Sequence, residues 1–192
     1  MPADGAPLAG LAGVVLAAGQ ARRFGADKRW ASWQDEPLLA HVLRTAWATC
    51  DRVLVVVERH DPALDELLGR LPAEPVVCPD ARRGLAFSRR CGLDALNGDP
   101  GLRGVLVFLG DMPAIRPADA RRLGRRMLET GLPVRPVYRG EPGHPVACPA
   151  QWLAELRESG FPGEQGRLIE WGHVGVVRDV DYPADLCRLV EP

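Results

Sequence analysis

The residues best suited to chemistry lie in one polar stretch near the start of the chain. An apolar run ends at Ala18 and Gly19, and the loop that follows carries Arg23, Gly25 and Lys28. Glycines let backbone N–H groups approach phosphate oxygens closely, and basic side chains supply the opposite charge. Lys28 is the only lysine among 24 basic residues, and a compact ammonium contacts phosphate differently from a flat guanidinium. The stretch predicts a phosphate-binding loop in which Lys28 is functional; the alternative is that its charges are only solvated.

The spacing of this loop excludes two common phosphate-binding motifs. Gly19 and Gly25 are one residue too far apart for a P-loop, Lys28 does not follow the second glycine, and no Gly-x-Gly-x-x-Gly occurs here. The chain is therefore predicted to be neither a P-loop ATPase nor a dinucleotide-binding Rossmann domain.

A second candidate is Asp111, which directly follows the apolar run 104–109 and Gly110. A carboxylate that faces a phosphate loop repels the phosphates unless a cation lies between them. At an effective dielectric constant of ~20, two unit charges 4 Å apart interact by roughly 4 kcal/mol. Asp111 therefore predicts a ligand for Mg²⁺, with Mn²⁺ as the alternative ion. The other interpretation is that Asp111 only caps the turn before Pro113.

Five further residues are candidates with open alternatives. Asp179 and Asp181 point the same way if a strand continues through them and could add a metal ligand, whereas Asp181 could instead cap a helix that begins near Pro183. Gly84 with Ser88 could hold a base or ribose, or could simply be a turn and a helix residue. His144 is either catalytic or a loop histidine bonded to the backbone.

The periodicity of apolar residues predicts the elements that must position these side chains. Strands are expected at 11–17, 52–57, 76–78, 104–109, 134–138 and 174–180, and helices at 37–48, 61–68, 85–96, 117–128, 152–156, 167–171 and 184–190. This alternation predicts an α/β protein with a three-layer, Rossmann-like, mostly parallel sheet and helices on both faces. Ligands bind at the carboxyl ends of such strands, so the loops after the first strand and after Leu109 should share a cleft.

The composition limits the class of protein. The chain of 192 residues fits one domain, predicted at 11–192 after a disordered tail at 1–10. Five scattered cysteines without a Cys-x-x-Cys pair indicate reduced thiols in the cytoplasm rather than a disulfide framework or zinc site. A net charge of −1 argues against nucleic-acid and membrane partners. The four arginines at 121–122 and 125–126 are predicted to be a solvated helix face.

Together these residues resemble a known family. The stretch Leu16-Ala17-Ala18-Gly19-x-x-x-Arg23-Phe24-Gly25-x-x-Lys28 resembles the signature of nucleotidyltransferases with a GT-A-like fold. The segments 109–113, 143–146 and 179–186 resemble those of the molybdenum-cofactor branch of that family. The resemblance implies Mg²⁺-dependent transfer of a nucleoside monophosphate from an NTP to the terminal phosphate of molybdopterin, with release of pyrophosphate.

The resemblance also implies roles for individual residues. Arg23, Lys28 and Asp111 would be catalytic, Asp111 and Asp181 would bind the metal, and Met112, Gly143 and His144 would bind the acceptor. The nucleotide would contact Leu16, Ala17, Ala18, Gly19, Arg23, Gly25, Lys28, Gly84, Ser88 and Gly110. The Ala-Ala-Gly form of the signature resembles the cytidylyltransferases, so CTP is the expected nucleotide.

Three alternatives remain at the level of the sequence. The nucleotide could be GTP, as in the guanylyltransferases, or the acceptor could be another small phosphate ester. The third alternative is a non-catalytic carrier that delivers the cofactor to the apo-form of a molybdenum hydroxylase. The retention of both Lys28 and Asp111 argues against a carrier.

Overall fold

The computed structural model describes residues 6–19 and 23–189. Parts of three predictions lie outside these residues: positions 1–5 of the tail, 20–22 of the phosphate-binding loop and Val190 of the closing helix. The described chain is built around an eight-stranded sheet with the order β10-β7-β9-β6-β1-β4-β5, and β8 pairs with β7. Its strands are β1 (Leu8–Leu16), β4 (Cys50–Val57), β5 (Glu74–Val77), β6 (Gly104–Leu109), β7 (Val134–Tyr138), β8 (Glu141–Pro142), β9 (Val146–Pro149) and β10 (Arg167–Glu170).

The centre of the sheet consists of strands that are apolar along most of their length. β1 pairs in parallel with β4 on one side and β6 on the other, and Val14, Val55 and Val107 are almost fully buried. Side chains on both faces of such strands need apolar cover, which explains their continuous apolar sequences. The β4–β5 and β7–β10 pairs are also parallel, whereas β9 runs antiparallel to β6 and β7. The predicted mostly parallel α/β sheet is confirmed.

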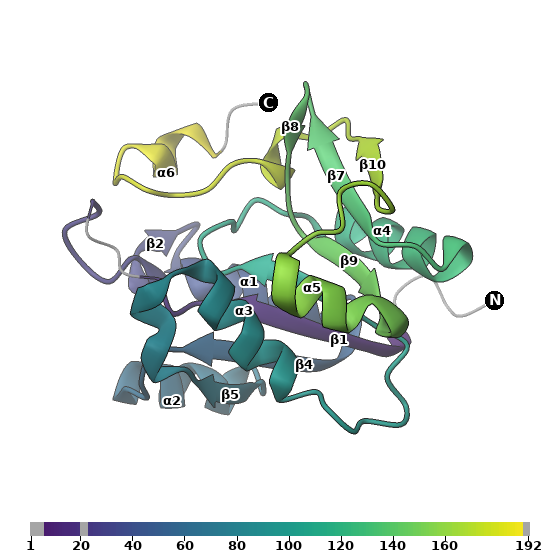
Figure 1. Cartoon of the computed structure of the whole chain (residues 1–192). Helices are drawn as coiled ribbons and strands as arrows, with labels where there is room; N and C mark the ends of the chain where they lie inside the picture. Colours follow the sequence, from purple (N-terminus) through teal and green to yellow (C-terminus); the bar gives the residue numbers. More distant parts are fainter. Residues whose placement is uncertain (1–5, 20–22, 190–192) are drawn as a thin grey trace.

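Helices cover both faces of the sheet. In Figure 1, α3 and α5 lie in front of the sheet, and α1 and α4 lie behind it. Residues of α1, α2 and α4 share one apolar cluster with the sheet, and residues of α3 and α5 share the other. The helices are α1 (Leu38–Trp47), α2 (Pro62–Arg70), α3 (Leu85–Asp94), α4 (Pro117–Thr130), α5 (Leu153–Ser159) and α6 (Asp185–Arg188). Short 3₁₀ turns are η1 (Lys28–Trp30), η2 (Pro79–Arg83), η3 (Ala150–Trp152) and η4 (Val174–Val176), and a small hairpin is formed by β2 (Ser32–Trp33) and β3 (Glu36–Pro37).

The predicted helix at 167–171 is wrong, because this segment contains strand β10. Ile169 and Trp171 pack against the core, while Leu168 is 58% exposed and Glu170 is also exposed. This alternation has the period of a strand. The backbone of β10 pairs in parallel with β7, a long-range contact that local helical spacing does not reveal.

The predicted strand at 174–180 is also wrong. The segment begins with the turn η4, in which Gly175 N donates to the His173 side chain. A Cβ on Gly175 would collide with Ala114 O, so the chain passes very close to the loop after β6. Further along, Val180 N donates to Asp111 O at 3.0 Å. Contacts with the loop after β6 therefore hold the segment 174–180 in place of regular hydrogen bonding to a neighbouring strand.

Two expectations about the chain as a whole also need correction. β1 begins at Leu8, whose N–H donates to Thr49 O, so residues 8–10 belong to the sheet rather than to a disordered tail. Cys78 and Cys91 form a disulfide with a Cα–Cα distance of 6.0 Å, whereas Cys50, Cys148 and Cys187 are free thiols. The expectation that all five cysteines are reduced is therefore wrong. Within residues 6–19 and 23–189, no helix has the length and apolar character needed to cross a membrane.

Candidate active site

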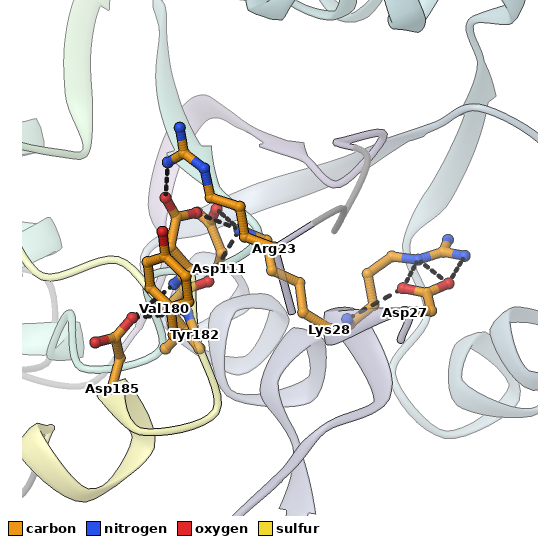
Figure 2. Close-up of polar contacts among 9 residues, drawn as sticks. Arg23, Asp27, Lys28, Asp111, Val180, Tyr182 and Asp185 are labelled. Atoms are coloured by element: carbon orange, nitrogen blue, oxygen red, sulfur yellow. Dashed lines mark hydrogen bonds and ion pairs between the residues drawn. The ribbon is translucent and has the colours of Figure 1, made fainter. Parts of the chain in front are cut away.

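The side chain of Lys28 joins three segments that are far apart in the sequence. Its ammonium donates to Asp111 Oδ2 at 2.6 Å, to Val180 O at 2.9 Å and to Asp181 Oδ1 at 3.3 Å. Figure 2 shows this convergence, with Arg23 approaching from the same loop as Lys28. β1 leads into that loop and β6 leads to Asp111, and these two strands are parallel neighbours. The predicted shared position of the two loops at the carboxyl end of the sheet is therefore observed.

Three carboxylates gather beside Lys28. Asp111, Asp179 and Asp181 each present an oxygen atom, and these oxygens lie within 4.8 Å of one another. Asp111 Oδ1 is buried and has no hydrogen-bond partner among the described residues. Hard divalent cations such as Mg²⁺ and Mn²⁺ prefer carboxylate oxygens. The donor set and the unpartnered oxygen therefore fit a divalent cation.

The charges in this cluster shift one another. Burial opposes the charge of Lys28, but the carboxylates of Asp111 and Asp181 outweigh it and raise the pKa of Lys28. Burial also opposes ionisation of Asp181, yet contacts with Lys28 and Arg23 lower its pKa. The pKa of Asp179 is raised first by burial and then by the like charges of Asp111 and Asp181. The cluster is thus rich in negative charge, which favours a further cation.

One interpretation of the sequence was that Asp181 caps the last helix, and this interpretation is wrong. The N-cap of α6 is Ala184, which makes no side-chain cap hydrogen bond. Asp185, the first residue of α6, accepts hydrogen bonds at Oδ2 from the backbone N–H groups of Asp181 and Tyr182 at 3.0 and 2.7 Å. The side chain of Asp181 is left to bind Lys28 and also accepts from Arg23 Nη1 at 2.9 Å. Arg23 is 68% exposed, so it can turn toward a ligand.

The loop that carries Lys28 is braced by contacts that the sequence did not reveal. Arg29 Nη2 contacts Asp27 Oδ2 at 2.5 Å and Asp61 Oδ2 at 2.9 Å. Asp61 also caps α2, because its Oδ1 accepts a hydrogen bond from Leu64 N at 3.0 Å. The loop is thereby tied to the start of a helix that packs on the sheet.

Two hollows open beside this loop, with volumes of about 440 and 450 Å³. Ala18, Gly19 and Arg82 line both of them. The first is also lined by Ala17, Gly25, Ala26, Asp27, Arg29, Glu58 and Arg59, and the second by Leu16, Ala81, Gly84, Leu85, Ser88, Leu109 and Asp111. Seven of the residues predicted to contact a nucleotide therefore lie on these walls, namely Leu16, Ala17, Ala18, Gly19, Gly25, Gly84 and Ser88.

Gly110 has a different place from these seven residues. Its N–H donates to Leu16 O at 2.9 Å, and a Cβ there would lie 3.0 Å from that of Ala17. The absence of a side chain therefore lets the ends of β1 and β6 approach each other, which brings the two loops together.

The three predicted acceptor-binding residues lie in tightly packed surroundings. Met112 is 3% exposed, so its side chain is part of the core. A Cβ on Gly143 would collide with Val176 O, and His144 N donates to the same oxygen at 2.7 Å. The bond between His144 and Pro145 is cis. In this structure Gly143 and His144 pack against Val176, which lies just before the segment that carries Asp179 and Asp181.

Comparison with known proteins agrees with this geometry. Residues 13–174 match the MobA-like NTP transferase domain family. The chain belongs to this family. The resemblance inferred from the sequence is confirmed, and the protein is a nucleotidyltransferase.

Individual members of the MobA-like family are similar over nearly the whole chain. The molybdenum cofactor guanylyltransferase of Pseudomonas fluorescens (strain SBW25) is 29% identical over 98% of this chain and 92% of its own length. The molybdenum cofactor cytidylyltransferase of Escherichia coli (strain K12) is 22% identical over 93% of this chain and 94% of its own length.

Solved structures support the same fold. The crystal structure of Rv0371c from Mycobacterium tuberculosis H37Rv has a TM-score of 0.71 and 26% identity, and the match covers 95% of this chain and 97% of that one. A structure of the Rv0371c complex with manganese has a TM-score of 0.66 and 24% identity, and covers 94% and 98% of the two chains.

Proposed function

We propose that this protein transfers CMP from CTP to the terminal phosphate of a molybdopterin-type acceptor and releases pyrophosphate. The observation that carries the proposal is the convergence of Lys28 with Asp111, Asp179 and Asp181 beside two hollows at the carboxyl end of the sheet. The molybdenum-cofactor transferases among its relatives support the acceptor class. The Ala17-Ala18-Gly19 sequence, which resembles that of the cytidylyltransferases, supports CTP.

In the proposed reaction, an oxygen of the acceptor phosphate attacks the α-phosphorus of CTP. The new P–O bond forms as the bond from the α-phosphorus to the α,β-bridging oxygen breaks, and pyrophosphate takes up the negative charge. Arg23 and Lys28 align the triphosphate and stabilise the charge that develops on the leaving group. Asp111 and Asp181, with Asp179 beside them, would hold Mg²⁺. When bound, Mg²⁺ supplies positive charge between the carboxylates and the phosphates.

A second candidate function is guanylyl transfer to the same acceptor. It is favoured by the relatives, among which molybdenum cofactor guanylyltransferases are the more numerous. The chemistry of the carboxylate cluster is the same for both nucleotides, so only the contacts to the base differ.

The experiment is a pyrophosphate-release assay with Mg²⁺, molybdopterin or its molybdenum form, and CTP, GTP, ATP or UTP. We expect release with CTP and a loss of at least about 100-fold in kcat/KM for Lys28→Ala and Asp111→Ala, because each removes charge at the reacting phosphates. Asp65→Asn, at an exposed position on α2, is the control and should keep full activity. Release with GTP alone would replace the proposed nucleotide. No release from folded protein that binds the cofactor would instead favour a carrier that supplies a molybdenum hydroxylase.

A further inference from the structure

A pair of opposite charges lies at the junction of the two hollows. Arg82, in η2, donates from Nε to Glu58 Oε1 at 2.6 Å, and Glu58 directly follows β4. Both residues line the first hollow, and Arg82 lines the second as well. The described contacts of Arg82 with Glu58 both use Oε1, so Oε2 can accept a hydrogen bond from a ligand.

The charges on the walls indicate which part of a nucleotide lies near this pair. Asp111 lines the second hollow, so the phosphates belong near Asp111 and Lys28. The first hollow is lined by Asp27, Arg29, Arg59 and Glu58 as well as Arg82, and Arg29 is already paired with Asp27 and Asp61. The Glu58 carboxylate would repel a phosphate placed against it. A base carries no charge, and its amino group is a hydrogen-bond donor. Glu58 is therefore suited to the base end of the nucleotide.

We propose that Glu58 and Arg82 determine which base is accepted. Glu58 accepts a hydrogen bond from the exocyclic amino group of the base, and Arg82 donates to the neighbouring ring nitrogen or carbonyl oxygen while it holds Glu58 in place. Pairing of carboxylates with cytosine N4 and of guanidinium groups with base acceptors is established hydrogen-bond chemistry. This inference rests on the proposed function and names the part of the site that selects the nucleotide.

The pair favours a base with an amino group over its deaminated counterpart. Cytosine offers N4–H to Glu58 and N3 and O2 to Arg82, whereas uracil places the O4 acceptor against the carboxylate. Sites built to accept a hydrogen bond from a substrate discriminate strongly against analogues that lack the donor, since the buried acceptor is left unpaired. Guanine, which carries an amino group at C2, is distinguished from hypoxanthine by the same rule.

The test measures kcat/KM for CTP and UTP, and in parallel for GTP and ITP, in the pyrophosphate-release assay. Glu58→Gln keeps the size of the side chain but adds an N–H donor that can face uracil O4. We expect the CTP-to-UTP ratio to fall by tenfold or more in Glu58→Gln. Arg82→Met should lower the same ratio, because Glu58 loses its partner. Arg83→Met, in the same turn but stacked on Phe87 at 4.0 Å, should leave the ratio unchanged.

The outcomes separate this inference from the proposed function. If wild-type protein releases pyrophosphate but Glu58→Gln keeps the wild-type ratios for both nucleotide pairs, the inference is overturned while the function stands. If only the GTP-to-ITP ratio falls, Glu58 still reads the amino group and the nucleotide is GTP. If wild-type protein uses no nucleotide, the proposed function itself fails. A melting temperature of each variant within the wild-type range shows that a lost ratio does not result from unfolding.

Discussion

Lys28 occupies the centre of the candidate site and contacts oxygens that also suit a divalent cation. Its ammonium lies 2.6 Å from Asp111 Oδ2 and its side chain is only 14% exposed. Asp111, Asp179 and Asp181 form a carboxylate cluster. Without a metal, the positive charges that contact this cluster among the described residues are those of Lys28 and Arg23. An ammonium and Mg²⁺ therefore stabilise the same cluster.

We predict that Lys28→Met makes the folded protein depend on Mg²⁺. In EDTA the variant should lose about 1–2 kcal/mol of unfolding free energy, because three carboxylates lose a partly buried cation. Mg²⁺ should raise the melting temperature of the variant more than that of wild type. Thermal unfolding with EDTA and across a Mg²⁺ titration measures both effects. Arg90→Met, which breaks an exposed pair with Glu158, is the control, and an equal Mg²⁺ response in wild type and Lys28→Met would contradict the prediction.

Single residues differ in how far the sequence identifies them. Asp111 lies just after β6, and Lys28 ends the loop that follows β1. Their local sequence pattern was enough to predict them, because the carboxyl ends of neighbouring parallel strands lie at the same edge of the sheet. Asp179 and Asp181 were grouped on the assumption of a strand, yet they converge because Val180 binds both Lys28 and the Asp111 backbone. Glu58 also directly follows a predicted strand, but the sequence does not show that Arg82 lies beside it. Its candidate role appears only when β4 and η2 are folded beside the loop.

Elements were predicted well where a buried strand or a long amphipathic helix imposes its own period. β6 has the predicted limits, and α4 differs from its prediction by two residues at its end. The second half of the chain was predicted less well, because β10 and the segment after it depend on pairing and on contacts with the loop after β6. Short segments contain too few residues for periodicity to decide between a strand and a helix.

Helix α3 provides a prediction at the scale of an element. Gly92 lets α3 lie close to the sheet, since a Cβ there would be 2.5 Å from Val14 Cγ1 and 2.8 Å from Val56 Cγ2. Gly92→Ala should therefore lower the unfolding free energy by about 1–3 kcal/mol through overpacking. Gly69→Ala in α2 is the matched control, because a Cβ there meets no described atom within 4 Å. That variant should gain up to about 1 kcal/mol in helix propensity. Urea unfolding of both variants checks the sign, and equal losses would refute the packing argument.

At the scale of the whole molecule, the layered architecture was predictable because alternating strands and helices leave few ways to bury two apolar faces. The position of β9 between β6 and β7 was not predictable from periodicity, since an antiparallel strand inserted in a parallel sheet has the same apolar pattern. The Cys78–Cys91 disulfide was missed for a similar reason, because it joins the end of β5 to α3 and only the fold brings these segments together. The site depends on local sequence pattern and on long-range contacts. The loops that carry Lys28 and Asp111 follow strands that the sequence predicts. The segment that carries Asp179 and Asp181 is positioned by contacts that the sequence does not predict.

The stability of the whole fold should depend on pH through His144. Burial lowers the pKa of this imidazole to about 4; the charge of Arg135 acts in the same direction, whereas the Val107 carbonyl and Asp111 oppose it. The ordinary pKa is 6.5, so between pH 6.5 and 4 the unfolded chain binds a proton that the folded protein does not. The protonation of His144 therefore does not change the free energy of unfolding above pH 6.5. As the pH drops toward 4, it lowers the free energy of unfolding by up to about 3 kcal/mol.

The variant His144→Gln isolates this effect, because glutamine can still donate to the Val107 carbonyl but does not titrate. Urea unfolding at pH 7 and pH 4.5 should show a smaller loss of unfolding free energy for the variant than for wild type. Carboxylates that titrate in the same range contribute equally to both proteins, so the difference between the two losses belongs to residue 144. Identical losses would mean that the folded protein protonates His144 as readily as the unfolded chain does. The imidazole would then be in contact with water, and the segment of Gly143 and His144 would not be packed against Val176 as the structure has it.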